Sequence, residues 1–166
     1  TYTGQVAISR SNIAIYGETT TPATYTGNKV TFAAAVTASQ AGNNDASGTI
    51  RVLATGVKLY NLNIANTYGT VTNKTQAIAL SVQAGQFGCY GCKITGIQDT
   101  LLANKGAQVY AQSYISGSTD FIFGSSASIW ITKSIIQTLA NGYITASGRS
   151  SEDANYYVID QSTIQG

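Results

Sequence analysis

Short apolar segments recur along the chain, and turn residues separate them. They occupy residues 6–8, 13–15, 57–64, 88–94, 109–115, 129–135 and 158–164. Valine and isoleucine are frequent in these segments, which is typical of β-strands. Apolar positions at helical spacing are nearly absent, and only residues 32–38 are a candidate for one turn of helix. The pattern therefore predicts an all-β protein.

The longer segments also resemble one another. In residues 109–115, 129–135 and 158–164, an aliphatic residue lies six positions before an isoleucine. Isoleucines 64, 94, 115, 135 and 164 then follow one another at steps of 30, 21, 20 and 29 residues. Strand-only repeats of about 20–30 residues with variable insertions are typical of a solenoid. We therefore expect a parallel β-helix that occupies residues 1–166 as a single domain.

The alternative architecture is a β-sandwich built from hairpins. Hairpins favour Asn-Gly and Asp-Gly turns, and the only such dipeptide in the chain is Asn141-Gly142. The composition agrees with a solenoid that has a polar, weakly charged surface. Hydrophobic residues make up 43% of the chain, but charged residues make up only 10%, against about 25% in typical soluble domains.

The charge and the apolar patterning narrow the classes of partner. The formal net charge is +2 and the basic residues form no run, so we expect no nucleic-acid partner. No stretch of 18 apolar residues occurs, so we expect no membrane-spanning helix. The β-rich composition and the sequon Asn73-Lys74-Thr75 favour a secreted, extracellular protein.

The chain contains no histidine. This absence removes Ser-His and Cys-His catalysis and histidine-based metal sites. Cys89 and Cys92 form a Cys-x-x-Cys pair, but their flanks look like strand or turn, whereas a redox pair normally begins a helix. We expect a structural role, either as buried thiols or as a local disulfide. Acid–base chemistry then falls to other groups, above all carboxylates, and we expect no cofactor.

Two acidic motifs lie one repeat apart. Asp99 belongs to Gln98-Asp99-Thr100-Leu101, and Asp120 begins Asp120-Phe121-Ile122-Phe123-Gly124, 21 residues later. Stacked strands are about 4.8 Å apart, so the two carboxylates would be neighbours on successive rungs. Gln76 lies 23 residues before Asp99, and we expect it on the preceding rung in one column with the two acids.

Three motifs in this region resemble the signatures of the pectin methylesterase (pectinesterase) family. They are Gln76-Ala77-Ile78-Ala79-Leu80, Gln98-Asp99-Thr100-Leu101 and the ten residues 115–124, which end in Asp120-Phe121-Ile122-Phe123-Gly124. The motif sequences resemble those of microbial members, in particular fungal ones, more than those of plant members. The resemblance implies a right-handed parallel β-helix that removes methyl esters from homogalacturonan, the main chain of pectin. It also implies a hydrolase that modifies cell walls and acts as a monomer.

The resemblance also implies a role for each site residue. Asp120 is the nucleophile, Asp99 is the proton donor and then the base, and Gln76 and Gln98 stabilise the oxyanion. Thr49, like Gln76, is expected to contact the substrate. Elementary electrostatics agrees, because two adjacent carboxylates do not both ionise easily, so one pKa rises and the other falls.

Interpretations without a catalytic or binding role also stay open for these residues. The aspartates could be turn residues, the two glutamines a stacked amide ladder, and Thr49 a surface strand residue. Phe121 and Phe123 are expected in the core, because a regular strand points them away from Asp120. Trp130 is also expected to pack.

One family motif, Leu-Gly-Arg-Pro-Trp, has no match in the chain. In the family, its arginine orients the nucleophile and its tryptophan packs on sugar, and family spacing would place it beyond Gly166. We therefore expect an internal fragment, incomplete at both ends, that lacks activity by itself. The alternative functions are a non-catalytic β-helix that binds polygalacturonate and another pectin-degrading β-helix enzyme.

Overall fold

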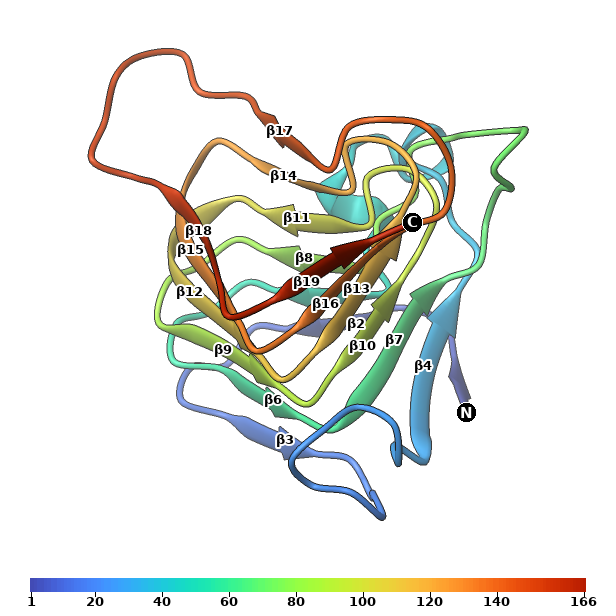
Figure 1. The fold of residues 1–166 in the computed structure, drawn as a ribbon, viewed down its shortest axis with the longest axis vertical. Coiled ribbons are helices and arrows are strands. Elements are labelled where there is room, and N and C mark those ends of the chain that lie inside the picture. The colour runs from blue at the N-terminus through green and yellow to red at the C-terminus, as the bar shows by residue number, and fades with distance from the viewer.

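The computed structural model describes residues 1–166, and it shows a coil of nineteen short strands (Figure 1). All strand pairs are parallel, and strands three places apart in the chain lie side by side in three sheets. Each turn of the coil, or rung, contributes one strand to each sheet. Parallel connections of this kind are right-handed almost without exception, and the chain is a right-handed parallel β-helix. The sequence prediction of the fold is confirmed.

The three sheets contain the following strands. Sheet A contains β1 (Tyr2–Thr3), β4 (Val30–Ala34), β7 (Leu62–Asn66), β10 (Lys93–Thr95), β13 (Tyr114–Gly117), β16 (Ile135–Thr138) and β19 (Thr163–Gln165). Sheet B contains β2 (Val6–Ile8), β5 (Ile50–Val52), β8 (Leu80–Val82), β11 (Leu101–Ala103), β14 (Ile122–Gly124) and β17 (Thr145–Ser147). Sheet C contains β3 (Ala14–Tyr16), β6 (Lys58–Tyr60), β9 (Phe87–Tyr90), β12 (Lys105–Ala111), β15 (Ser126–Thr132) and β18 (Tyr157–Asp160).

The longer apolar segments of the sequence are not single strands. Each crosses the corner from a sheet C strand to the next sheet A strand, which we name the C/A corner. The corner residue has a positive φ on five successive rungs, at Asn61, Gly91, Gln112, Lys133 and Gln161. The spacing of six residues therefore spans a bend in the coil, but it does not mark pairs of buried residues, because Val109 and Ile135 are only half-buried.

The core lies inside the coil, where side chains from the three sheets meet in stacked columns. One column contains Ile64, Ile94, Ile115, Ile136 and Ile164 in strand register. The sequence alignment chose Ile135 in place of Ile136, which was wrong by one residue. The one-residue error in the alignment also affects Trp130. Trp130 pairs with Val109, faces outward and is 43% exposed, so the expectation that it packs was wrong.

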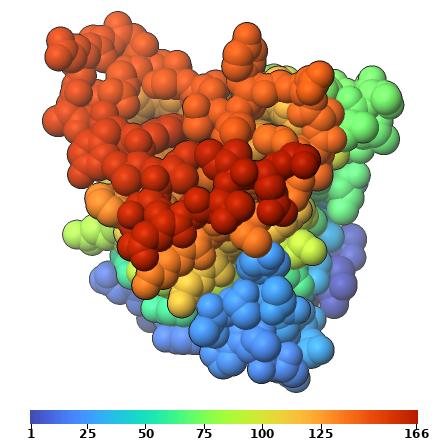
Figure 2. All heavy atoms as spheres, in the orientation of Figure 1, coloured from blue at the N-terminus to red at the C-terminus, as the bar shows by residue number.

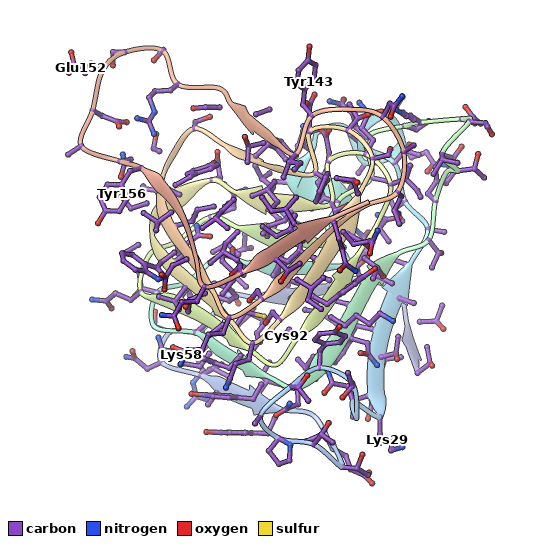
Figure 3. All side chains as sticks on the ribbon, viewed as in Figure 1. Lys29, Lys58, Cys92, Tyr143, Glu152 and Tyr156 are labelled. Carbon is purple, nitrogen blue, oxygen red and sulfur yellow. The ribbon has the colours of Figure 1, made fainter.

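Serine hydroxyls stack beside the C/A corner on the inside of the coil. The backbone N–H of Ser113 donates to Ser134 Oγ at 3.0 Å, and that of Ser134 donates to Ser162 Oγ at 3.1 Å. The N–H of Cys92 donates to Ser113 Oγ in the same way. Cys92 thus occupies a serine position of this column, its side chain lies inside the coil (Figure 3), and Cys89 and Cys92 are buried, unbridged thiols.

Two insertions cover the first rungs. Residues 17–29, between β3 and β4, form a loop that stands out as a blue lobe at the bottom of Figure 2. Residues 35–49 carry the helix α1 (Ala38–Ala41), which a Thr37–Gln40 capping box begins, and the 3₁₀ turn η1 (Asp45–Ser47). The candidate helix at residues 32–38 was therefore misplaced, because its first three residues belong to the strand β4 and only Ala38 belongs to α1.

No helix in the structure has the length and apolar character needed to cross a membrane.

Candidate active site

Asp99 and Asp120 lie where the chain leaves sheet A and enters sheet B, which we name the A/B corner. Both have positive φ, 63° for Asp99 and 48° for Asp120. The N–H of Asp99 donates to the carbonyl of Thr119 at 3.2 Å, which places the two aspartates on adjacent rungs. Residues other than glycine are uncommon in this region, and aspartate is among those that tolerate it best. The corner geometry and the stacking therefore bring the two carboxylates together.

The column at this corner differs from the expected one by one position. Gln76 pairs with Gln98, and Gln98 pairs with Thr119, in parallel bridges. Gln76 is thus the equivalent of Gln98, and not of the aspartates, which form the next column. The expectation of a single amide–acid–acid column was wrong, but the side chain of Gln76 still reaches Asp99, because its Nε2 donates to Asp99 Oδ2 at 2.9 Å.

The carboxyl group of Asp99 is nearly enclosed, with the residue only 3% exposed. Burial raises the pKa of Asp99 to about 6; the hydrogen bond from Gln76 opposes this change and the nearby Asp120 adds to it. Desolvation disfavours the ionised form, and a neighbouring carboxylate does the same. Asp99 can therefore hold a proton near neutral pH, whereas an ordinary aspartate cannot.

Asp120 is in a different environment. It is partly exposed, and its N–H donates to the carbonyl of Tyr143 at 2.7 Å. Tyr143 is 76% exposed, and Figure 3 shows its side chain projecting away from the body of the coil. One carboxyl group of the pair is thus shielded and the other is open to a ligand. Such an asymmetric pair can divide the roles of acid and nucleophile.

Asn44 is a site neighbour that the sequence pattern did not reveal. Its Nδ2 donates to Asp99 Oδ2 at 3.4 Å, the same oxygen that Gln76 contacts. The next residue, Asp45, forms an ion pair with Arg51 and accepts a hydrogen bond from Ser81 Oγ at 2.7 Å. Burial raises the pKa of Asp45, but these partners outweigh it and hold the pKa below its usual value. The inserted segment 35–49 therefore supplies one wall of the site.

The outer face of sheet B is hollowed beside this wall. The sheet B hollow has a volume of about 400 Å³, and Asn44, Leu102 and Phe123 line it. Phe121 is fully buried, as expected, but Phe123 is only half-buried and faces outward, so the expected core position of Phe123 was wrong. The positive φ of Asp120 interrupts the alternation of the strand, and both Phe121 and Ile122 consequently point inward.

The other two predicted residues are placed very differently. Gln98 is half-buried in the column between Gln76 and Thr119. Thr49 has no exposed surface, and its hydroxyl donates to the carbonyl of Ala65 at 2.9 Å. A side chain turned into the coil cannot touch a ligand outside it, so the expected substrate contact of Thr49 is corrected to a structural hydrogen bond. The structure contains no cluster of three or more His, Cys, Asp or Glu side chains close enough to hold a metal ion.

The fold and the site define a parallel β-helix with a shielded and an open aspartate at one corner. The pectinesterase sequence profile matches residues 1–166, so the chain belongs to the pectinesterase family. A probable pectinesterase A from Neosartorya fischeri is 42% identical over 168 residues, which cover 100% of this chain and 51% of that protein. A pectinesterase from Aspergillus aculeatus is 45% identical, covering 99% of this chain and 51% of its own.

The structural comparison agrees. The crystal structure of a pectin methylesterase from Aspergillus niger superposes with a TM-score of 0.94 at 40% identity, over 99% of this chain and 54% of that one. The chain therefore spans about half the length of the relatives that it matches.

Proposed function

We propose that the protein is a pectin methylesterase, which hydrolyses the methyl esters of galacturonan to free carboxylates and methanol. The observation that carries this proposal is the aspartate pair on adjacent rungs, with a raised pKa at Asp99 and an open position at Asp120. Family membership supports the reaction class.

In the proposed first half-reaction, the ionised carboxylate of Asp120 attacks the carbonyl carbon of the ester. The carbonyl oxygen becomes an oxyanion, to which the side-chain amides of Gln76 and Gln98 donate hydrogen bonds. Gln76 Nε2 carries two N–H groups, so one can remain on Asp99 while the other reaches the oxyanion. One well-placed donor of this kind contributes about 3 kcal/mol to transition-state stabilisation.

The oxyanion then collapses and the bond to the methoxy oxygen breaks. Protonated Asp99 gives its proton to that oxygen, so methanol leaves and an anhydride joins Asp120 to the galacturonate carbonyl. Ionised Asp99 next takes a proton from water, and the resulting hydroxide attacks the same carbonyl carbon. The anhydride breaks, the free galacturonate leaves, and both aspartates return to their starting states.

The proposed setting follows from the substrate. Pectin lies outside the cell, so we propose a secreted protein that works as a monomer on a polysaccharide, without a nucleic-acid or membrane partner.

The test measures methanol released from methyl-esterified pectin by the intact protein, together with reducing ends and viscosity. We expect methanol without new reducing ends, and a loss of at least about 10³-fold in Asp120→Asn. Gln112→Asn is the matched control, because Gln112 has the same corner conformation at the C/A corner, with a φ of 52°. Retained methanol release in folded Asp120→Asn would overturn the mechanism, and chain cleavage would indicate another pectin-degrading activity.

A further inference from the structure

The largest hollow of the molecule lies away from the two aspartates, on the outer face of sheet A. This sheet A hollow has a volume of about 460 Å³, and six of its eight lining residues are polar or charged. Its floor is formed by outward side chains of β4, β7 and β10, including Thr31, Asn63, Lys93 and Thr95, and Tyr25 and Asn28 of the loop 17–29 form one wall. A concave surface of this size with converging polar groups is typical of a small-ligand site.

The wall of the hollow is held in place before any ligand arrives. Asn61 Nδ2 at the C/A corner donates to the carbonyls of Pro22 and Thr24, both at 3.2 Å. Asn28 Nδ2 donates to the carbonyl of Gly91 at 2.9 Å. The ring of Tyr25 packs against that of Tyr114, two rungs further along the coil than Asn61, with centroids 5.2 Å apart. A prearranged wall lowers the entropy cost of binding.

The only charge in the lining of the sheet A hollow is positive. Lys93 is the only charged residue in its lining, and none of the seven acidic residues belongs to it. The Lys93 ammonium is exposed and forms no ion pair; its contact is the Tyr114 ring, with Nζ 5.5 Å from the centroid. A lysine supplies a single point charge, whereas phosphate groups are usually held by the planar fork of arginine or by several donors. The hollow therefore fits a ligand with one carboxylate.

The remaining lining favours a ligand with hydroxyl groups. Asn63 Nδ2 donates to Thr31 Oγ1 at 3.2 Å, which fixes an amide and a hydroxyl side by side on the floor. Asn28, whose Oδ1 is buried without a hydrogen-bond partner, adds a second amide side chain to this lining. The half-buried ring of Tyr25 adds an apolar surface of the kind that packs against a sugar ring.

We propose that the sheet A hollow is a second carbohydrate site, which binds an unesterified galacturonate unit through its carboxylate at Lys93. The choice of galacturonate among hydroxylated carboxylates rests on the proposed function. A neighbouring depression shares Ala65 and Thr95 with the sheet A hollow and continues to Gly96 and Ile97, directly before Gln98. The site would hold already de-esterified units of a pectin chain while esterified units lie at the A/B corner.

The test uses an unesterified galacturonate trimer, which contains no ester and so reports on binding independently of turnover. Amide chemical shifts of the intact protein are followed during titration, with a neutral galactose trimer in parallel. We expect shifts at Asn28, Asn63 and Thr95, and about tenfold weaker binding there in Lys93→Gln. Lys105→Gln is the matched control, since Lys105 is an exposed lysine of sheet C outside the hollow. The affinity of this variant for the trimer should stay within about twofold of the wild-type value.

Lys93→Arg keeps the charge and should retain most of the affinity, which separates loss of charge from loss of shape. Shifts confined to the surroundings of Asp99 and Asp120 would overturn the proposal, as would equal effects of Lys93→Gln and Lys105→Gln. Equal binding of the neutral trimer would also overturn it. Failure of methanol release alone would leave the binding result standing, so the two proposals fail separately.

Discussion

The C/A corner and the A/B corner both place residues with positive φ on successive rungs, but their side chains differ. At the C/A corner these residues include Asn61, Gln112 and Lys133, and the serines that follow the last two form hydrogen bonds with the backbone. At the A/B corner the residues are Asp99 and Asp120, and the segment 35–49 with Asn44 covers one of them. The same backbone bend thus stabilises the coil at one corner and presents two carboxylates at the other.

The difference lies in how completely the polar groups are satisfied. Ser134 Oγ donates to the carbonyl of Thr132 and accepts from the N–H of Ser113, at 2.8 and 3.0 Å. Asp99 is equally buried, but both of its hydrogen bonds reach one oxygen, Oδ2, and its neighbour is another acid. A buried carboxyl group with too few hydrogen bonds lowers the stability of the fold, and its pKa is raised. Raised pKa values are frequent among catalytic carboxyl groups.

The largest expected effect is a loss of activity, and it should occur for substitutions at the A/B corner but not at the C/A corner. Asp99→Asn keeps the shape of the side chain but cannot deliver and recover a proton, so methanol release should fall by about 10²–10⁴-fold. Gln112→Asn at the C/A corner should leave activity unchanged. Initial rates on methyl-esterified pectin at substrate saturation measure both. Equal activities of the two variants would contradict the assignment of acid–base chemistry to the A/B corner.

The next effect concerns the pH dependence of stability. The pKa of Asp99 is about 6 in the folded protein, against 3.8 without burial. Because the folded state holds this proton more tightly, its contribution is complete below about pH 4 and is lost as pH rises through about 6. The wild type should therefore lose up to about 3 kcal/mol more unfolding free energy than Asp99→Asn between pH 4 and 7.

Urea unfolding of both proteins across this pH range measures the difference, and the carboxyl groups that do not interact with Asp99 cancel in the comparison. Parallel curves for the wild type and Asp99→Asn would show that burial does not perturb Asp99.

A smaller effect is expected at the C/A corner. Ser134→Ala removes the acceptor of the Ser113 N–H inside the coil and should lower the unfolding free energy by about 1–3 kcal/mol. Methanol release well below the melting temperature should not change. Ser39→Ala, at an exposed position of α1, is the control and should be neutral within about 0.5 kcal/mol. A loss of activity without a loss of stability would contradict the purely structural role of this corner.

The smallest effect tests the backbone conformation itself. Gln112→Gly should raise the unfolding free energy by up to about 1 kcal/mol, because glycine adopts a positive φ without steric cost. Ala111→Gly, one residue earlier in β12, should instead lower it by about 0.5–1 kcal/mol. Thermal unfolding of the two variants measures both signs, and destabilisation by Gln112→Gly would show that the Gln112 side chain contributes more than its conformation costs.

The sequence predicted the coil because stacking repeats the same buried residue on each rung, as at Ile64, Ile94 and Ile115. Apart from β2, it did not predict the strands of sheet B, such as β8 and β11, since no isoleucine spacing marks them. Insertions of variable length also obscured the strand register in the sequence, so Ile135 was aligned with Ile115 although Ile136 stacks on it. Register depends on which side of the backbone faces the core, and an adjacent pair of isoleucines leaves that open.

For the site, the two aspartates and the two glutamines could be predicted from the sequence, because their motifs are local and their spacing is close to one turn of the coil. Their surroundings depend on tertiary contacts and could not be predicted in this way. Asn44 arrives from an insertion, Phe123 turns outward, and Thr49 turns inward. These placements depend on backbone torsions at the corners and on how inserted loops cover neighbouring rungs, both of which are set by packing between residues far apart in the chain.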